Sequence, residues 1–140
     1  IFRQEIPYVK LAPSVALDYD TKRYNKVVSN TLFSIEQSIE YKKQGLFDYV
    51  WLDEWDLKEE DGTQKKLYTK ETFDKLREVG YKIALITPEL HGTSPGLLGG
   101  ESHQDSRDKD TLFKRIIEII SLNPDAICTD YPRESKNLVI

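Results

Sequence analysis

The stretch YKIALIT (residues 81–87) decides which fold class the sequence predicts. It is a nearly continuous apolar run of strand length, which is typical of a strand buried on both faces of a parallel sheet. The segment before it, residues 69–80, has apolar side chains at helical spacing, a threonine suited to cap its start and a glycine at its end. A helix followed by a buried strand is one repeat of an α/β fold.

The same alternation extends over the rest of the chain. Strands are expected at residues 1–5, 47–55 and 125–132, and a helix over DTLFKRIIEIISLN (residues 110–123). Another helix is expected to begin at Ser29 or Asn30, to place Leu32 and Phe33 on its apolar face and to stop at Gly45. Before it, SVALDY (residues 14–19) could hold a short element. The pattern predicts an α/β fold with about four parallel strands joined by crossover helices.

Composition and charge narrow the classes of protein to consider. The 140 residues fit one domain, and 39% hydrophobic residues are enough for a core. A formal net charge of −4 argues against a nucleic-acid partner or an anionic membrane surface, and no apolar run approaches the ~18 residues of a membrane span. The only cysteine, Cys128, cannot form an intrachain disulfide, so a cytoplasmic, reducing location is expected. Because the chain lacks methionine and begins at Ile1, we interpret it as part of a longer protein.

Polar side chains gather where each predicted strand ends. In chain order these strand ends are Arg3-Gln4-Glu5, Asp53-Glu54-Trp55-Asp56, Glu89-Leu90-His91 and Thr129-Asp130. Because the carboxyl ends of parallel strands share one face, where ligands bind in such folds, these side chains are expected to converge. Asp53 and Glu54 are neighbours and point to opposite sides of a strand, so one of them is expected to pair with a helix instead.

This set of side chains suits a hard divalent cation and a phosphate. Carboxylates such as Glu54 would hold Mg²⁺ or Ca²⁺, and Arg3 could pair with a phosphate in a bidentate way. His91, with Glu89 nearby, could act as general acid or base. The residues expected to contact substrate are Arg3, Trp51, Trp55 and Asp130. The long connection over residues 91–110 is expected to be either a lid or a disordered tip.

Three segments, in this order, resemble one known family. DYVWLDEW (residues 48–55), GYKIALITPELHG (80–92) and DAICTDYP (125–132) look like the last three strands of a glycerophosphodiester phosphodiesterase-like protein. That family belongs to the phosphatidylinositol phospholipase C-like phosphodiesterases. The branch it resembles is small and bacterial, with a strand V-W-L-D-E, a strand ending S-P-E-L-H-G and a final C-T-D-[FY]-P; here Thr87 replaces the serine. IFRQ (residues 1–4) resembles the strand before them.

The resemblance implies the C-terminal half of a (β/α)₈ barrel with a divalent metal at its carboxyl-terminal mouth. It implies a small phosphodiester substrate, as in lipid metabolism, with Glu54 at the metal site and Glu89 and His91 in catalysis. The family's H-R-G and E-x-D motifs and a second catalytic histidine are not found here as a set. Glu54-Trp55-Asp56 resembles E-x-D only superficially, since no His-Arg-Gly precedes it. The chain alone is therefore expected to be inactive.

Two alternatives to this hydrolase stay open. The chain could be a non-catalytic half-barrel that self-associates and binds a phosphorylated or sugar ligand. It could also be a glycosidase that uses Glu54 and Glu89 as its carboxylate pair. A half-barrel has two open strand edges, which either an N-terminal half or a second copy of the chain would have to cover.

Overall fold

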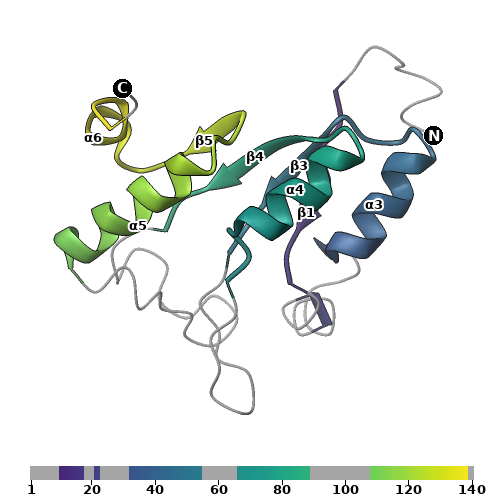
Figure 1. Cartoon of the computed structure of the whole chain (residues 1–140), viewed down its shortest axis with the longest axis horizontal. Helices are drawn as coiled ribbons and strands as arrows, with labels where there is room; N and C mark the ends of the chain where they lie inside the picture. Colours follow the sequence, from purple (N-terminus) through teal and green to yellow (C-terminus); the bar gives the residue numbers. More distant parts are fainter. Residues whose placement is uncertain (1–9, 18–20, 23–31, 55–65, 89–107, 139–140) are drawn as a thin grey trace.

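The chain forms an α/β structure around one parallel sheet (Figure 1). The computed structural model describes residues 10–17, 21–22, 32–54, 66–88 and 108–138. The strands are β1 (Ser14–Val15), β2 (Leu32–Phe33), β3 (Tyr49–Leu52), β4 (Lys82–Ile86) and β5 (Ala126–Cys128). The helices are α3 (Ile35–Lys43), α4 (Lys70–Glu78), α5 (Lys109–Ser121) and α6 (Pro132–Lys136). The sheet is open and all its strands are parallel, which is consistent with half of a (β/α)₈ barrel.

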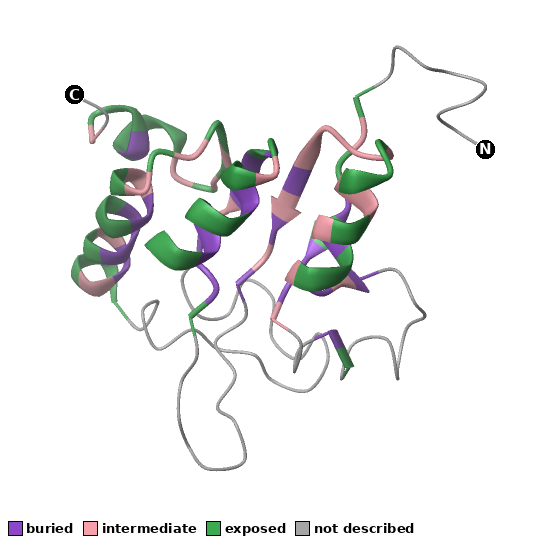
Figure 2. Ribbon diagram, turned by 45° about the vertical axis from the view of Figure 1, so that its right-hand side comes forward, coloured by how far each residue is buried: buried purple, intermediate pink, exposed green. Residues whose placement is uncertain are grey.

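The strand order is β2-β1-β3-β4-β5. β1, β3, β4 and β5 therefore lie side by side in chain order, as successive strands of a barrel do. Neither β1 nor β2 is among the four strands that the sequence predicts: β1 lies in SVALDY, the segment that could hold a short element, and β2 pairs with the outer edge of β1. Doubly wound sheets can have the same order, but their helices cover both faces. Here α3, α4 and α5 all pack on the same face, as in a half-barrel (Figures 1 and 2).

The core lies between this face of the sheet and the three helices (Figure 2). Side chains alternate between the two faces of a strand, and those facing the helices are fully buried. They include Val15, Val50, Leu52, Ile83 and Leu85, which pack with Phe73, Leu76 and Ile119 from the helices. The register places Val50 beside Ile83 and Leu52 beside Leu85, so the apolar side chains form continuous rows across the sheet.

The prediction that a helix begins at Ser29 or Asn30 is wrong for the described residues that follow them. Leu32 and Phe33 are not on a helix face but form strand β2, and the helix begins only after Ser34. The reason is a capping box: the Ser34 hydroxyl accepts from the Gln37 N–H at 3.2 Å, and the Gln37 side chain accepts from the Ser34 N–H at 2.9 Å. This pair satisfies the free N–H groups of Ser34 and Gln37 and fixes the start of the helix at Ser34.

The other predicted elements are confirmed with shorter bounds. Thr69 caps α4, and Gly80 and Gly45 follow their helices with φ of 86° and 73°, in the left-handed region that favours glycine. Asp108 caps α5, so that helix begins slightly earlier than predicted. Pro132, placed at the end of a strand by the sequence, instead starts α6. The strand predicted over residues 1–5 and most of the connection over residues 91–110 lie outside the described residues.

Removing the Ser34 cap should weaken α3. We expect Ser34→Ala to lower the free energy of unfolding by ~1 kcal/mol, because an N–H of the first turn loses its acceptor. Urea denaturation followed by circular dichroism measures this. Ser121→Ala, which removes an exposed serine from the last turn of α5, is the matched control and should cost clearly less. Equal effects of the two substitutions would contradict a capping role for Ser34.

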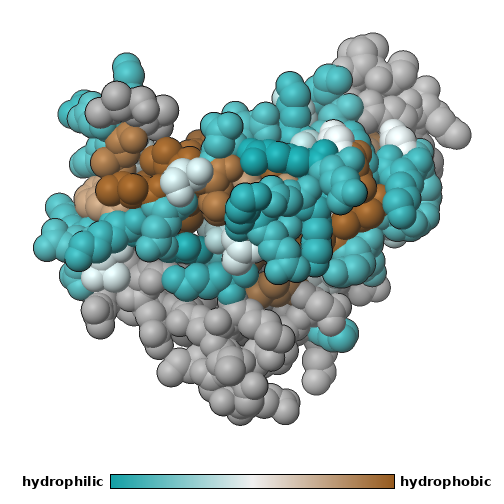
Figure 3. All heavy atoms as spheres, viewed as in Figure 1, coloured by the Kyte–Doolittle hydropathy of each residue, from teal (hydrophilic) through white to brown (hydrophobic). Residues whose placement is uncertain are grey.

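Apolar side chains reach the surface mainly around α5 and β5, at one end of the sheet (Figure 3). Among the described residues, Ile117 on α5 is the large apolar residue with the greatest exposure, at 49%. In the part of the chain that the structure describes, no helix is both long and apolar enough to cross a membrane.

Candidate functional site

The carboxyl ends of three neighbouring strands form one edge of the structure. Register places Leu52 of β3 beside Leu85 of β4, and Ile86 of β4 beside Cys128 of β5. The last bond between β4 and β5 runs from the Thr87 N–H to the Cys128 carbonyl oxygen, at 2.9 Å. The residues that follow these strands therefore leave the sheet at the same edge, where α/β folds bind their ligands.

Tyr68 links two of these strand ends. It lies just before α4, and its hydroxyl oxygen is 3.0 Å from the Leu52 carbonyl oxygen and 2.6 Å from the Ile86 carbonyl oxygen. The same hydroxyl accepts from the Glu54 N–H at 3.1 Å. One side chain thus fixes the spacing between the end of β3 and the end of β4.

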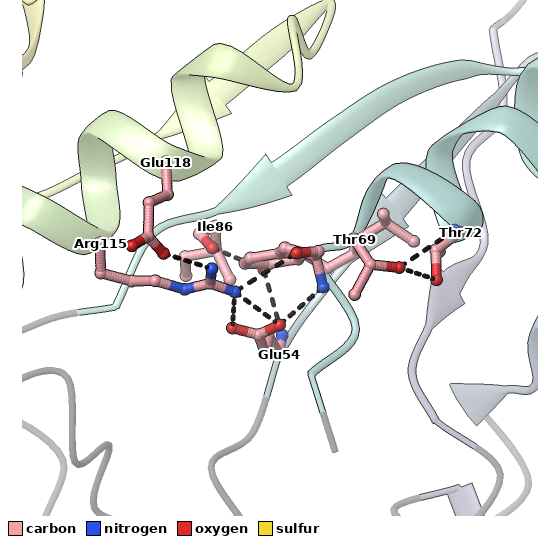
Figure 4. Close-up of polar contacts among 8 residues, drawn as sticks. Glu54, Thr69, Thr72, Ile86, Arg115 and Glu118 are labelled. Atoms are coloured by element: carbon pink, nitrogen blue, oxygen red, sulfur yellow. Dashed lines mark hydrogen bonds and ion pairs between the residues drawn. The ribbon is translucent and has the colours of Figure 1, made fainter. Parts of the chain in front are cut away.

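Glu54 forms a buried ion pair at this edge with Arg115 of α5 (Figure 4). The Arg115 Nη2 donates to both carboxylate oxygens, at 2.8 and 3.1 Å, and the Tyr68 N–H donates to one of them at 2.6 Å. Both side chains of the pair are only 6% exposed. Arg115 also contacts Glu118, which is exposed, at 3.0 Å. Glu54 thus pairs with a helix, as the sequence predicts for one of the neighbours Asp53 and Glu54.

The environment of Tyr68 keeps its hydroxyl protonated. Burial raises the pKa of Tyr68 well above its usual value of 10.0, and the nearby charge of Asp53 raises the pKa further. The hydroxyl therefore remains a hydrogen-bond donor to the strand carbonyls over the whole neutral range.

Tyr68 and Arg115 were not among the residues predicted for the site, although both had a signal in the sequence. Tyr68 directly precedes the Thr69 cap, and Phe73 stands at the fourth helical position, which is the pattern of a hydrophobic staple. Arg115 lies at helical spacing from Leu112 and Ile119, on the buried face of an apolar helix. A charged residue on such a face indicates a buried partner of opposite charge.

Three of the predicted site residues lie in the described part of the chain, and each has different surroundings. Glu54 is in the ion pair, Trp51 is half-buried on β3 on the sheet face opposite the core, and Asp130 is exposed just after β5. The other four, Arg3, Trp55, Glu89 and His91, lie outside the described residues. Their convergence with Glu54 and Asp130 therefore stays a prediction.

The described residues do not by themselves supply the ligands of a metal ion. Within the ranges given above, no three His, Cys, Asp or Glu side chains are grouped in a way that could hold one. A metal at Glu54 would have to displace Arg115 from the carboxylate, so that role also stays a prediction. The same contacts occupy the carboxylate that the glycosidase alternative requires.

Comparison with known proteins provides no relative: no family model matches the chain, and no curated protein or solved structure matches it. The structural feature that bears on function is the sheet edge at which β3, β4 and β5 end. In the described part, this edge carries one carboxylate held by a buried arginine, a clamp between two strand ends, and the exposed Asp130 beside them.

Proposed function

We propose that this chain is the C-terminal part of a phosphoric diester hydrolase-like barrel of the glycerophosphodiester phosphodiesterase type. The observation that carries the proposal is the open, all-parallel sheet, whose strands β3, β4 and β5 end together at one edge. In the sequence, Trp55 directly follows Glu54, and Glu89 and His91 come after Pro88. In barrels of this kind, residues that follow the strands form the active site.

The proposal assigns binding, and not turnover, to this chain alone. Arg3 would contact the phosphate, and His91 with Glu89 would orient the substrate and handle its proton. Trp51, Trp55 and Asp130 would contact the rest of the substrate. A divalent metal, Mg²⁺ or Ca²⁺, belongs to the intact barrel in this proposal. Because the described residues do not form its ligand set, no step is derived through it.

The proposal predicts that the chain binds a small phosphodiester and does not hydrolyse it. We expect a saturable ³¹P NMR response of dimethyl phosphate, and no release of methanol. Arg3→Met should weaken this binding by about tenfold or more, because it removes a charged hydrogen-bond donor to the phosphate.

Lys70→Met is the control for Arg3→Met. It removes an exposed cation on α4 whose described ion pair is with Asp74, and it should leave the affinity unchanged. An equal loss from Lys70→Met would reduce the binding to general charge attraction. No saturable response from the unmodified chain would contradict the proposal.

A second candidate function is a half-barrel that binds its own copy. The observation that favours it is the open sheet, in which β2 and β5 each pair with a single described strand. Unpaired strand edges pair readily with other chains unless something covers them.

Self-association predicts a defined dimer in size-exclusion chromatography with light scattering. Ala126→Lys, which places a charge at an exposed position of the β5 edge, should shift the dimer toward monomer. Gln44→Lys, at an exposed position after α3, should leave it intact. A monodisperse monomer of the unmodified chain at high micromolar concentration would rule this function out.

A further inference from the structure

We draw no further inference here: the strongest candidate, the small cavity at the ends of β4 and β5 that Thr87, Cys128 and Asp130 line, carries nothing, because Asp130 already has an interaction and a water molecule would serve the buried Thr87 hydroxyl as well as any ligand would.

Discussion

Glu54→Gln should lower the free energy of unfolding by about 3–5 kcal/mol, because it removes the buried charge that pairs with Arg115 and leaves the exposed Glu118 as the described counter-charge of the guanidinium. The Glu54 carboxylate accepts from Arg115 and from the Tyr68 N–H, and both ion-pair side chains are 6% exposed. A glutamine has almost the same shape, but it carries no charge and its amide group offers one acceptor oxygen in place of two. A typical domain has 5–15 kcal/mol of stability, so the loss would be a large share. Urea denaturation at neutral pH measures it.

The same arginine provides the control for Glu54→Gln. Glu118 also contacts Arg115, but its side chain is 62% exposed, so Glu118→Gln should cost less than ~1 kcal/mol. The double variant Glu54→Leu with Arg115→Met replaces the pair with apolar side chains and should recover most of the lost stability. If Glu54→Gln and Glu118→Gln have similar effects, the ion pair does not carry the stability of this sheet edge.

Much of the fold could be predicted because its signals are local. The apolar run around Ile83 and Leu85, the cap at Thr69 and the glycines at the helix ends each determine a few residues of backbone, and the structure confirms them. The error at Leu32 and Phe33 has a local cause as well. Two apolar residues just before a helix fit its apolar face by spacing, and only the capping box at Ser34 shows that the helix begins after them.

The site could be predicted only in outline because its contacts join distant parts of the chain. Polar residues after each strand could be read from the order of elements, and one of Asp53 and Glu54 was expected to pair with a helix. That the helix is α5 and the partner Arg115, 61 residues away, depends on how the helix rotates against the sheet. The position of the Tyr68 hydroxyl between the Leu52 and Ile86 carbonyls depends on the same packing.

Alkaline conditions should unfold this protein through its buried tyrosines. Burial raises the pKa of Tyr68 well above 10.0 and that of Tyr81 to about 12, and the Tyr81 hydroxyl donates to the Ser38 carbonyl oxygen at 2.7 Å. Below pH 10, folded and unfolded chains both hold these protons, so the contribution of the two groups to stability is constant. As pH rises above 10, the unfolded chain releases them while the folded chain keeps them, and stability falls. Each group adds up to ~1.4 kcal/mol of loss per pH unit until its folded pKa is reached.

Tyr68→Phe should make this fall shallower. The phenylalanine variant has no proton to release at this position, so its stability should decrease less steeply between pH 10 and 12. At neutral pH it should already be less stable by ~1 kcal/mol or more, because the Leu52 and Ile86 carbonyls lose their shared donor. Urea denaturation at steps of pH from 8 to 11.5 gives the slope for the unmodified chain, for Tyr68→Phe, for Tyr81→Phe and for the double variant. We expect each single variant to reduce the slope and the double variant to reduce it most. A Tyr68→Phe slope equal to that of the unmodified chain would mean that the Tyr68 hydroxyl is not held protonated at the strand ends.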